Sequence, residues 1–405
     1  MNLTQSLDIT KIRSEFPILH QHVNGKPLVY LDNAATTPVA PEVVEAMIPV
    51  LRDTFGNPSS THSFGRNAKA LLETSRRIVA KHLNCAASEI IFTSGGTEAD
   101  NMAIHTAVTE LGVKRIITSA IEHHAVGHTA DAVSAHEKIE LVLVNLDSKG
   151  NVDLIHLENL LKEAKPTLVS LMHANNEIAT MIPLKKVAQL CRQYGAYLHS
   201  DTVQTMAHFA FDLADLDIDF ITCAAHKFHG PKGIGFLYAN KKTKVTSFIH
   251  GGAQERGLRG GTENLAGIVG LAKAMDLAYE DVEAHQKHVF SLKSYMITQL
   301  HALFPTVSFH GETDFDKALY TVLNVCLPAT EKTSMLLFTL DLKGVAVSGG
   351  SACTSGATKG SHVLEGIHAD MTRPNVRFSF SRYTTKEEID YALQQLQQVY
   401  QHNLS

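Results

Sequence analysis

The stretch DFITCAAHKFHGPKGIGFLYAN (219–240) decides the fold of this chain. It opens with an apolar run that is typical of a buried strand, and a loop rich in glycine and proline follows. The second apolar run, GIGFLYAN (233–240), comes after too few residues for a helical crossover. It is therefore expected to pair antiparallel at one edge of the sheet. Lys227 lies where the first run ends, which predicts an amine at the carboxyl end of a strand.

Strand-like runs alternate with helical patterns on the N-terminal side of this stretch. They are EIIFTS (89–94), RIITSA (115–120), IELVLVNL (139–146), TLVSLMHA (167–174) and AYLHSD (196–201). This alternation predicts an α/β fold with a mainly parallel sheet covered by helices on both faces. A long helical stretch over 264–303 then leads to a second part, with strands near 318–327, 344–348 and 377–382 and a terminal helix from Lys386.

The composition is that of a soluble globular protein. Of the 405 residues, 44% are hydrophobic and 19% are charged, and the formal net charge is −5. This balance argues against nucleic acid or an anionic membrane as the main partner. No apolar run is long enough to cross a bilayer, and the N-terminus resembles a short amphipathic helix from Asp8 more than a secretory signal. The five cysteines include no CxxC pair, which indicates reduced thiols and a cytoplasmic protein.

Three polar signals follow strand ends. In SGGTEADN (94–101), free N–H groups at a helix start predict either a phosphate site or a simple glycine turn capped by Thr97. Asp201 follows an apolar run and either caps the next helix or faces a pyridine nitrogen, which it would keep protonated. Lys227 and Lys232 compete as an amine nucleophile, and Lys227 is favoured because it adjoins the strand end.

These motifs resemble those of a known family. The lysine stretch resembles the signature of fold-type I, class V pyridoxal-phosphate-dependent aminotransferase-like enzymes, and YLDNAATTP (30–38) resembles their opening. The remaining motifs occur in the order found in cysteine desulfurases: FTSGGTEADN (92–101), EHHA (122–125), HANNE (173–177), SDTVQ (200–204) and RGLRGGTEN (256–264). SGGSACTSG (348–356) resembles the active-cysteine loop of the branch that serves nitrogen fixation and iron–sulfur cluster assembly.

The resemblance implies a domain organisation. A large cofactor-binding domain (29–265) would contain a mainly parallel seven-stranded sheet flanked by helices. A smaller α+β C-terminal domain (266–405) would carry the active cysteine loop, and an N-terminal segment (1–28) would pack on it. The family is also expected to form a homodimer in the cytoplasm.

The resemblance also implies pyridoxal 5′-phosphate as the cofactor and a role for each site residue. Lys227 would hold the cofactor covalently, His123 would stack on its ring and assist proton transfer, and Cys353 would receive sulfur. Asn33 and Arg377 would bind the substrate carboxylate. Further cofactor contacts are expected from Gly96, Thr97 and His226 at the phosphate, Asn175 and Asp201 at the ring, Gln204 at the phenolic oxygen, and Thr262 of the other subunit at the phosphate.

The implied activity converts L-cysteine to L-alanine and leaves the sulfur as a persulfide on Cys353. An iron–sulfur scaffold or another acceptor protein would take the sulfur, and Cys353 could transiently bind a nascent cluster; no intrinsic metal is expected. The alternatives are a selenocysteine lyase or another pyridoxal-phosphate-dependent β-lyase of the same family, and a catalytically silent scaffold or regulator with the same fold. A zinc site at His124 and His128 is a rival hypothesis, because their spacing places both on one helix face.

Two features depart from the family pattern. Ala224 occupies a position where the family commonly has a phosphate-binding serine, which predicts weaker cofactor retention unless Cys223 or water compensates. DITKIRSEFPIL (8–19) resembles the opening of the other, short-loop branch. From the residues alone, Cys353 lies in a small, polar, glycine-rich segment, which predicts an exposed thiol, whereas the other four cysteines lie in apolar or helical contexts.

Overall fold

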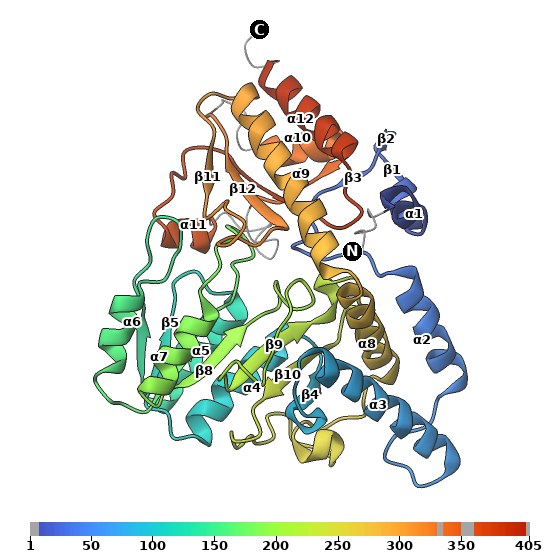
Figure 1. Ribbon diagram of the computed structural model, residues 1–405, viewed down its shortest axis with the longest axis vertical. Coiled ribbons are helices and arrows are strands. Elements are labelled where there is room, and N and C mark those ends of the chain that lie inside the picture. The colour runs from blue at the N-terminus through green and yellow to red at the C-terminus, as the bar shows by residue number, and fades with distance from the viewer. Residues whose placement is uncertain (1–7, 330–334, 350–359, 402–405) are drawn as a thin grey trace, which may run out of the picture.

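A seven-stranded sheet forms the centre of the computed structural model, which describes residues 8–329, 335–349 and 360–401 (Figure 1). The strand order is β4-β10-β9-β8-β7-β5-β6. The strands span Ile90–Thr93 (β4), Arg115–Thr118 (β5), Glu140–Leu143 (β6), Thr167–Ser170 (β7), Tyr197–Asp201 (β8), Phe220–Ala224 (β9) and Gly235–Ala239 (β10). The strands from β9 to β6 are parallel, which confirms the predicted α/β fold with a mainly parallel sheet.

Strand β10 is antiparallel to β9, as predicted, but it does not lie at the edge of the sheet. Its other side pairs with β4, also antiparallel, so β4 forms the edge. The short loop after β9 explains why β10 pairs with β9. Whether β10 is an edge strand depends on β4, which is distant in sequence and pairs with the other side of β10. The backbones approach closely here, since a Cβ on Gly235 would lie 2.1 Å from the Cys223 carbonyl oxygen.

Helices cover both faces of the sheet because successive strand residues point to opposite sides. Ile116, Leu168 and Phe220 pack with helices α4 and α5 on one face. Their neighbours Ile117, Val169 and Ile221 join the core that contains α3, α7 and α8. The helices and 3₁₀ turns of this part are α2 (Pro41–Asp53), α3 (Ser63–His82), η2 (Ala87–Glu89), α4 (Gly96–Thr109), α5 (His124–Glu137), α6 (Leu154–Leu161), α7 (Leu184–Gln193), η3 (Ala225–Lys227), η4 (Gln254–Gly257) and α8 (Leu265–Tyr279).

The C-terminal part has its own sheet and core, above the large sheet in Figure 1. Its three antiparallel strands are β11 (Ser308–His310), β12 (Val322–Cys326) and β14 (Asn375–Ser379), and β13 (Val345–Ala346) pairs with β3 (Val29–Tyr30). The helices are α9 (Val282–Leu303), α10 (Leu336–Leu342), α11 (His362–Gly366) and α12 (Lys386–Gln401). The helical stretch expected over 264–303 is thus two helices, α8 and α9.

The N-terminal segment contacts the C-terminal part. It comprises α1 (Ile9–Ser14), η1 (Pro17–His20) and the small hairpin of β1 (His22–Val23) and β2 (Lys26–Pro27). Arg13 of α1 donates a hydrogen bond to the Tyr383 carbonyl and pairs with Glu388 at 2.8 Å. The domain boundaries stay a prediction; α8 packs on α2 and α3, whereas α9 packs on α12.

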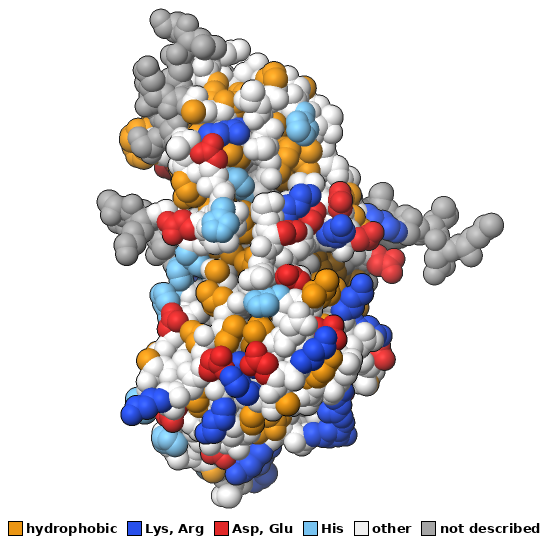
Figure 2. Space-filling model, turned by 90° about the vertical axis from the view of Figure 1, so that its left-hand side faces the viewer, with side chains coloured by type: hydrophobic (Ala, Val, Ile, Leu, Met, Phe, Trp, Pro, Cys, Tyr) orange, Lys and Arg blue, Asp and Glu red, His pale blue; other side chains and the backbone are white. Residues whose placement is uncertain are grey.

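The helices and the charged surface bear on whether the protein could contact a membrane or nucleic acid. Among the described residues, every helix is too short or too polar to cross a lipid bilayer. Acidic and basic side chains are interspersed on the face shown in Figure 2. That nucleic acid is not the main partner stays a prediction.

Candidate active site

A cavity of about 260 Å³ lies at the carboxyl ends of β8 and β9 and the start of α4. Ligands of open α/β sheets bind at this position. The residues that line it are Ala34, Ala35, Gly96, Thr97, Asp100, His123, Met172, Asn176, Asp201, Val203, Gln204, Ala224, His226, Lys227 and Arg377. The fold therefore brings eight of the residues predicted from sequence into one cavity.

The start of α4 forms one wall of this cavity. Gly95 precedes the helix without a capping side chain, so the first N–H groups of the helix are not satisfied by a cap. Gly96 leaves room there, since a Cβ at this position would lie 2.7 Å from Val203 Cγ2. Glu98 in the first turn is paired with Arg259 at 2.8 Å, so its negative charge is compensated.

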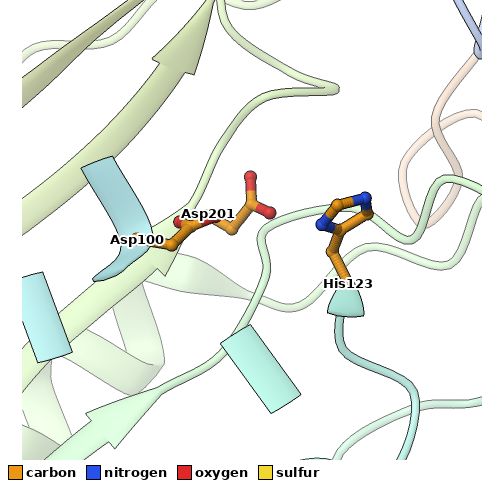
Figure 3. A group of neighbouring side chains, drawn as sticks. All are labelled: Asp100, His123 and Asp201. Carbon is orange, nitrogen blue, oxygen red and sulfur yellow. The ribbon is translucent and has the colours of Figure 1, made fainter. Parts of the chain in front are cut away.

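Asp201 ends β8 inside the cavity and is buried. One carboxylate oxygen accepts a hydrogen bond from the Val203 N–H at 2.9 Å. Burial raises the pKa of Asp201, whereas the nearby His123 and Lys227 and the bond from Val203 lower it. Burial also lowers the pKa of His123. In Figure 3, Asp201 lies between Asp100 and the His123 ring.

Asp100 is a cavity residue that the sequence analysis missed. It lies on α4, one turn after Gly96, so the helical spacing from the glycine turn was the available signal. Burial and the neighbouring Asp201 raise its pKa. Its Oδ1 has no hydrogen-bond partner among the described residues, although the buried His199 Nε2 lies 3.4 Å away. Ligand atoms of Asp100, His123 and Asp201 all lie within 4.8 Å of one another.

Lys227 lines the same cavity and lies at the end of the 3₁₀ turn that follows β9. Its Nζ donates hydrogen bonds to the carbonyl oxygens of Ala34 and Ala35, at 2.7 and 2.9 Å. Lys232 is exposed in the following loop and does not line the cavity. Of the two candidate lysines, the structure therefore places only Lys227 at the site. His226 beside it has a pKa of about 4, lowered by burial first and by Lys227 and Lys232 next.

Arg377 of β14 contributes a buried guanidinium to the cavity wall. It pairs with Asp32 at 2.9 Å and donates a second hydrogen bond to the Asn176 carbonyl oxygen at 3.0 Å. The C-terminal part of the chain thus supplies a fixed cation to a site formed mainly by the large sheet. A guanidinium in this place can bind a carboxylate through two parallel hydrogen bonds.

Three predicted site residues lie outside the cavity lining. Asn33 is buried and bonded to the Ser379 carbonyl oxygen and the Tyr383 hydroxyl. The Asn175 amide bonds to backbone groups of the preceding and following loops, and its neighbour Asn176 lines the cavity instead. Thr262 lines a separate cavity of about 240 Å³ near Ser94. Cys353 lies outside the described residues.

The four described cysteines are unsuited to thiolate chemistry. Cys191, Cys223 and Cys326 are buried and Cys85 is half-buried. Burial raises the pKa of Cys85 and of Cys191 to about 12, so both are thiols at neutral pH. Low-pKa, accessible cysteines are the reactive ones.

The rival zinc hypothesis at His124 and His128 receives no support from the geometry. The two rings stack with centroids 4.7 Å apart. Within the described part of the chain, the group of three potential metal ligands is Asp100, His123 and Asp201, and neither histidine belongs to it. The His124 ring also contacts His362 of α11, with centroids 4.3 Å apart.

Comparisons with known proteins show the family of this chain. The family model of aminotransferase class V matches residues 29–392. A cysteine desulfurase IscS of Dictyoglomus turgidum is 41% identical over 92% of this chain and 94% of that protein. A solved NifS-like protein superposes with a TM-score of 0.85 at 37% identity, over 93% of this chain and all of that one. A structure described as SspA in complex with cysteine has a TM-score of 0.76 at 30% identity, over 88% of this chain and 99% of that one.

The match extends over nearly the whole chain and includes every segment that forms the cavity. The chain therefore belongs to the class-V aminotransferase family, and within it to the homologues of the cysteine desulfurases.

Proposed function

We propose that this protein is a pyridoxal-phosphate-dependent cysteine desulfurase, which converts L-cysteine to L-alanine and transfers the sulfur to Cys353. One observation carries the proposal. The cavity brings together a lysine amine, a buried aspartate and an open helix start, which come from three separate segments of the chain. These are the groups that a cofactor with an aldehyde, a pyridine nitrogen and a phosphate requires.

The residues present fit that cofactor. The start of α4, with Gly96 and Thr97, would hold the phosphate, and Asp201 would hold the protonated ring nitrogen. Lys227 would bind the aldehyde carbon. When bound, the cofactor supplies an electron-withdrawing ring that makes bonds at the α- and β-carbons of an amino acid labile. Gln204 also lines the cavity, and its Nε2 donates a hydrogen bond to the Ala34 carbonyl oxygen at 3.0 Å.

The side chains of the cavity have different roles toward the substrate. Arg377 binds the α-carboxylate and so orients the α-carbon toward the Lys227 amine, which removes and returns the α-proton. His123 is neutral at physiological pH because its pKa is lowered, so its ring can accept or donate a proton near Asp201. The other predicted residues, Asn33, Asn175, His226 and the partner subunit's Thr262, act by positioning the reactants.

The sulfur transfer balances without an external oxidant. The Cys353 thiolate attacks the substrate sulfur, an S–S bond forms, and the C–S bond of the substrate breaks. The carbon keeps the electron pair and takes up a proton, which yields alanine. The high thiol pKa of Cys85 and Cys191 leaves both unsuited to this attack.

The names of the relatives support L-cysteine as the substrate. The names of the D. turgidum protein and of the SspA complex refer to cysteine desulfurase and to bound cysteine. We therefore propose an iron–sulfur scaffold or another acceptor protein as the partner of a cytoplasmic homodimer, with Cys353 able to contact a nascent cluster. The alternatives that the same site allows are a selenocysteine lyase and a catalytically silent scaffold.

Two pairs of variants test the proposal. Lys227→Ala should lose the visible absorption of the covalently bound cofactor, whereas the exposed Lys232→Ala should keep it. Cys353→Ala should keep that absorption and form no persulfide from L-cysteine, whereas Cys85→Ala should form it on Cys353, as located by mass spectrometry. Wild-type persulfide formation by Cys353→Ala would refute the assigned thiol. Faster turnover of selenocysteine than of cysteine would favour the lyase, and failure to bind the cofactor would favour the scaffold.

A further inference from the structure

Arg377 is surrounded by two acidic side chains that the proposed reaction does not use. Asp32 Oδ1 lies 2.9 Å from the guanidinium. Glu177 follows Asn176, whose carbonyl accepts a hydrogen bond from Arg377. Burial raises the pKa of Glu177, and the hydrogen bond from Ser361 and the charge of Arg377 oppose that rise. Glu177 is fully buried, and its Oε1 has no hydrogen-bond partner within the described ranges.

Each of these carboxylates accepts a hydrogen bond from a serine. Ser348 donates to Asp32 Oδ1 at 2.8 Å, and Ser361 donates to Glu177 Oε2 at 2.5 Å. Both serines are buried. Ser348 also exchanges two backbone hydrogen bonds with Arg377, at 2.7 and 3.3 Å. Ser348 is therefore fixed beside Arg377, and Ser361 is fixed to Glu177, whose neighbour Asn176 accepts a hydrogen bond from Arg377.

The two serines flank Cys353 in the sequence, so their hydrogen bonds can affect where its thiol lies. Ser348 precedes Cys353 by five residues and Ser361 follows it by eight, by subtraction of the residue numbers. Five extended residues span at most about 17 Å, so the location of Ser348 limits the volume that the thiol can reach. The arginine that is proposed to bind the substrate carboxylate bonds to Asp32, which holds Ser348, and to Asn176, the neighbour of the residue that holds Ser361.

We propose that Asp32 and Glu177 are positioning residues which, through Ser348 and Ser361, hold both ends of the segment that contains Cys353 at the substrate-binding arginine. This inference rests on the proposed function. The two serines contribute to sulfur transfer by keeping the thiol within reach of the pocket, and they do not contribute to binding of cofactor or substrate. Hydrogen bonds to charged groups are stronger than neutral ones, which suits them to this task.

If the two serines had a purely structural role, their loss would have a different effect. Ser361 is also the N-cap of α11, where its Oγ accepts from the Leu364 N–H at 3.2 Å. Loss of that cap would lower stability in general, with no selective effect on sulfur transfer. Ser348 is not the N-cap of any helix in the described part of the chain, so the single Ser348→Ala variant separates the two explanations.

The experiment uses the cofactor-loaded dimer and the Ser348→Ala and Ser348→Ala/Ser361→Ala variants. Addition of L-cysteine should change the visible absorption of the bound cofactor to the same extent and with the same concentration dependence as in the wild type. In single turnover, persulfide formation on Cys353 should slow by about threefold in the single variant and at least about tenfold in the double variant. Ser348→Thr/Ser361→Thr should restore it, and the exposed Ser291→Ala should not change it.

Amide exchange of the cofactor-free protein gives an independent measurement. Exchange should accelerate at 345–348 and 362–366 in the double variant and stay unchanged in β7 and β8. Persulfide formation at the wild-type rate in both alanine variants, failure of the threonine variant to restore it, or a loss of the cysteine-induced spectral change would each overturn the inference. An absence of persulfide in the wild type would instead refute the proposed function, and this inference with it.

Discussion

The buried ion pair of Arg76 and Glu255 allows a quantitative prediction. The side chains of both residues are only 2% exposed. Two parallel hydrogen bonds of 2.7 Å join them, and Glu255 Oε2 also accepts from the Phe92 N–H at 2.9 Å. Arg76 donates further to the Ile90 carbonyl at 2.8 Å. The pair therefore attaches the turn η4 to strand β4 beside the cavity that contains Thr262.

Glu255→Gln keeps the shape of the side chain but leaves the buried guanidinium with only the more distant and partly exposed Glu73 as a counter-charge. Breaking one side of a buried pair costs about 3–5 kcal/mol. The remaining amide oxygen can still accept one hydrogen bond, so we expect the free energy of unfolding to fall by about 3 kcal/mol. Because the pair joins η4 to β4, the edge strand of the sheet, the loss should appear first as local opening of η4 and β4.

Glu73→Gln is the matched control, since Glu73 approaches the same arginine. The distance is 3.5 Å and the Glu73 side chain is 39% exposed. Exposed pairs contribute about 0–1 kcal/mol, so this variant should hardly change stability. The assay is urea unfolding combined with amide exchange at 90–93 and 254–257. Equal losses of stability in the two variants, or a loss below about 1 kcal/mol for Glu255→Gln, would refute the reasoning.

Three other predictions concern the cavity and its surroundings. Gly96→Ala should weaken binding of pyridoxal phosphate or lower stability by about 1–3 kcal/mol, since its Cβ meets a valine at 2.7 Å, whereas Gly127→Ala, with nothing within 4 Å, should be tolerated; titration and thermal unfolding measure both. Burial lowers the pKa of His208 to about 4, so the unfolded chain binds the extra proton between about pH 4 and 6.5 and stability falls as pH drops through that window. His208→Gln should make this fall shallower, by up to about 1.4 kcal/mol per pH unit, and the exposed His136→Gln should not; unfolding followed at several pH values tests this. Ala224→Ser should lower the dissociation constant of pyridoxal phosphate by about two- to tenfold, and an unchanged or higher constant in an absorbance titration would contradict the role given to that position.

Local patterns were sufficient for the elements and for much of the site. Each strand expected in the large sheet is present, because hydrophobic runs between turn residues are set by nearest neighbours along the chain. The same holds for α12, which begins at Lys386 as predicted, and for α1, whose N-cap is Asp8. Lys227 and Asp201 could be placed at strand ends for the same reason, since the carboxyl ends of parallel strands meet at one edge.

Other features depend on contacts between distant segments. The sequence placed β10 at the edge, but β4 packs outside it. Asp100 was overlooked because its importance arises from the approach of α4 to β8, which brings it beside Asp201. Asn175 and Asn176 are adjacent in sequence, and only the turn that bonds the Asn175 amide to the backbone decides that Asn176 lines the cavity.

The sequence by itself determined the α/β fold, the lysine at the end of β9 and the family motifs that carry the proposed chemistry, because strand ends and glycine turns are local properties. Only the tertiary structure decided that Asn176 and not Asn175 lines the cavity, that Asp32 joins Arg377 to Ser348, and that Ser361 bonds to Glu177. The physical reason is that hydrogen bonds and ion pairs between segments hundreds of residues apart depend on how the two parts of the chain pack. That packing is a property of the whole buried surface, and no short stretch of sequence contains it.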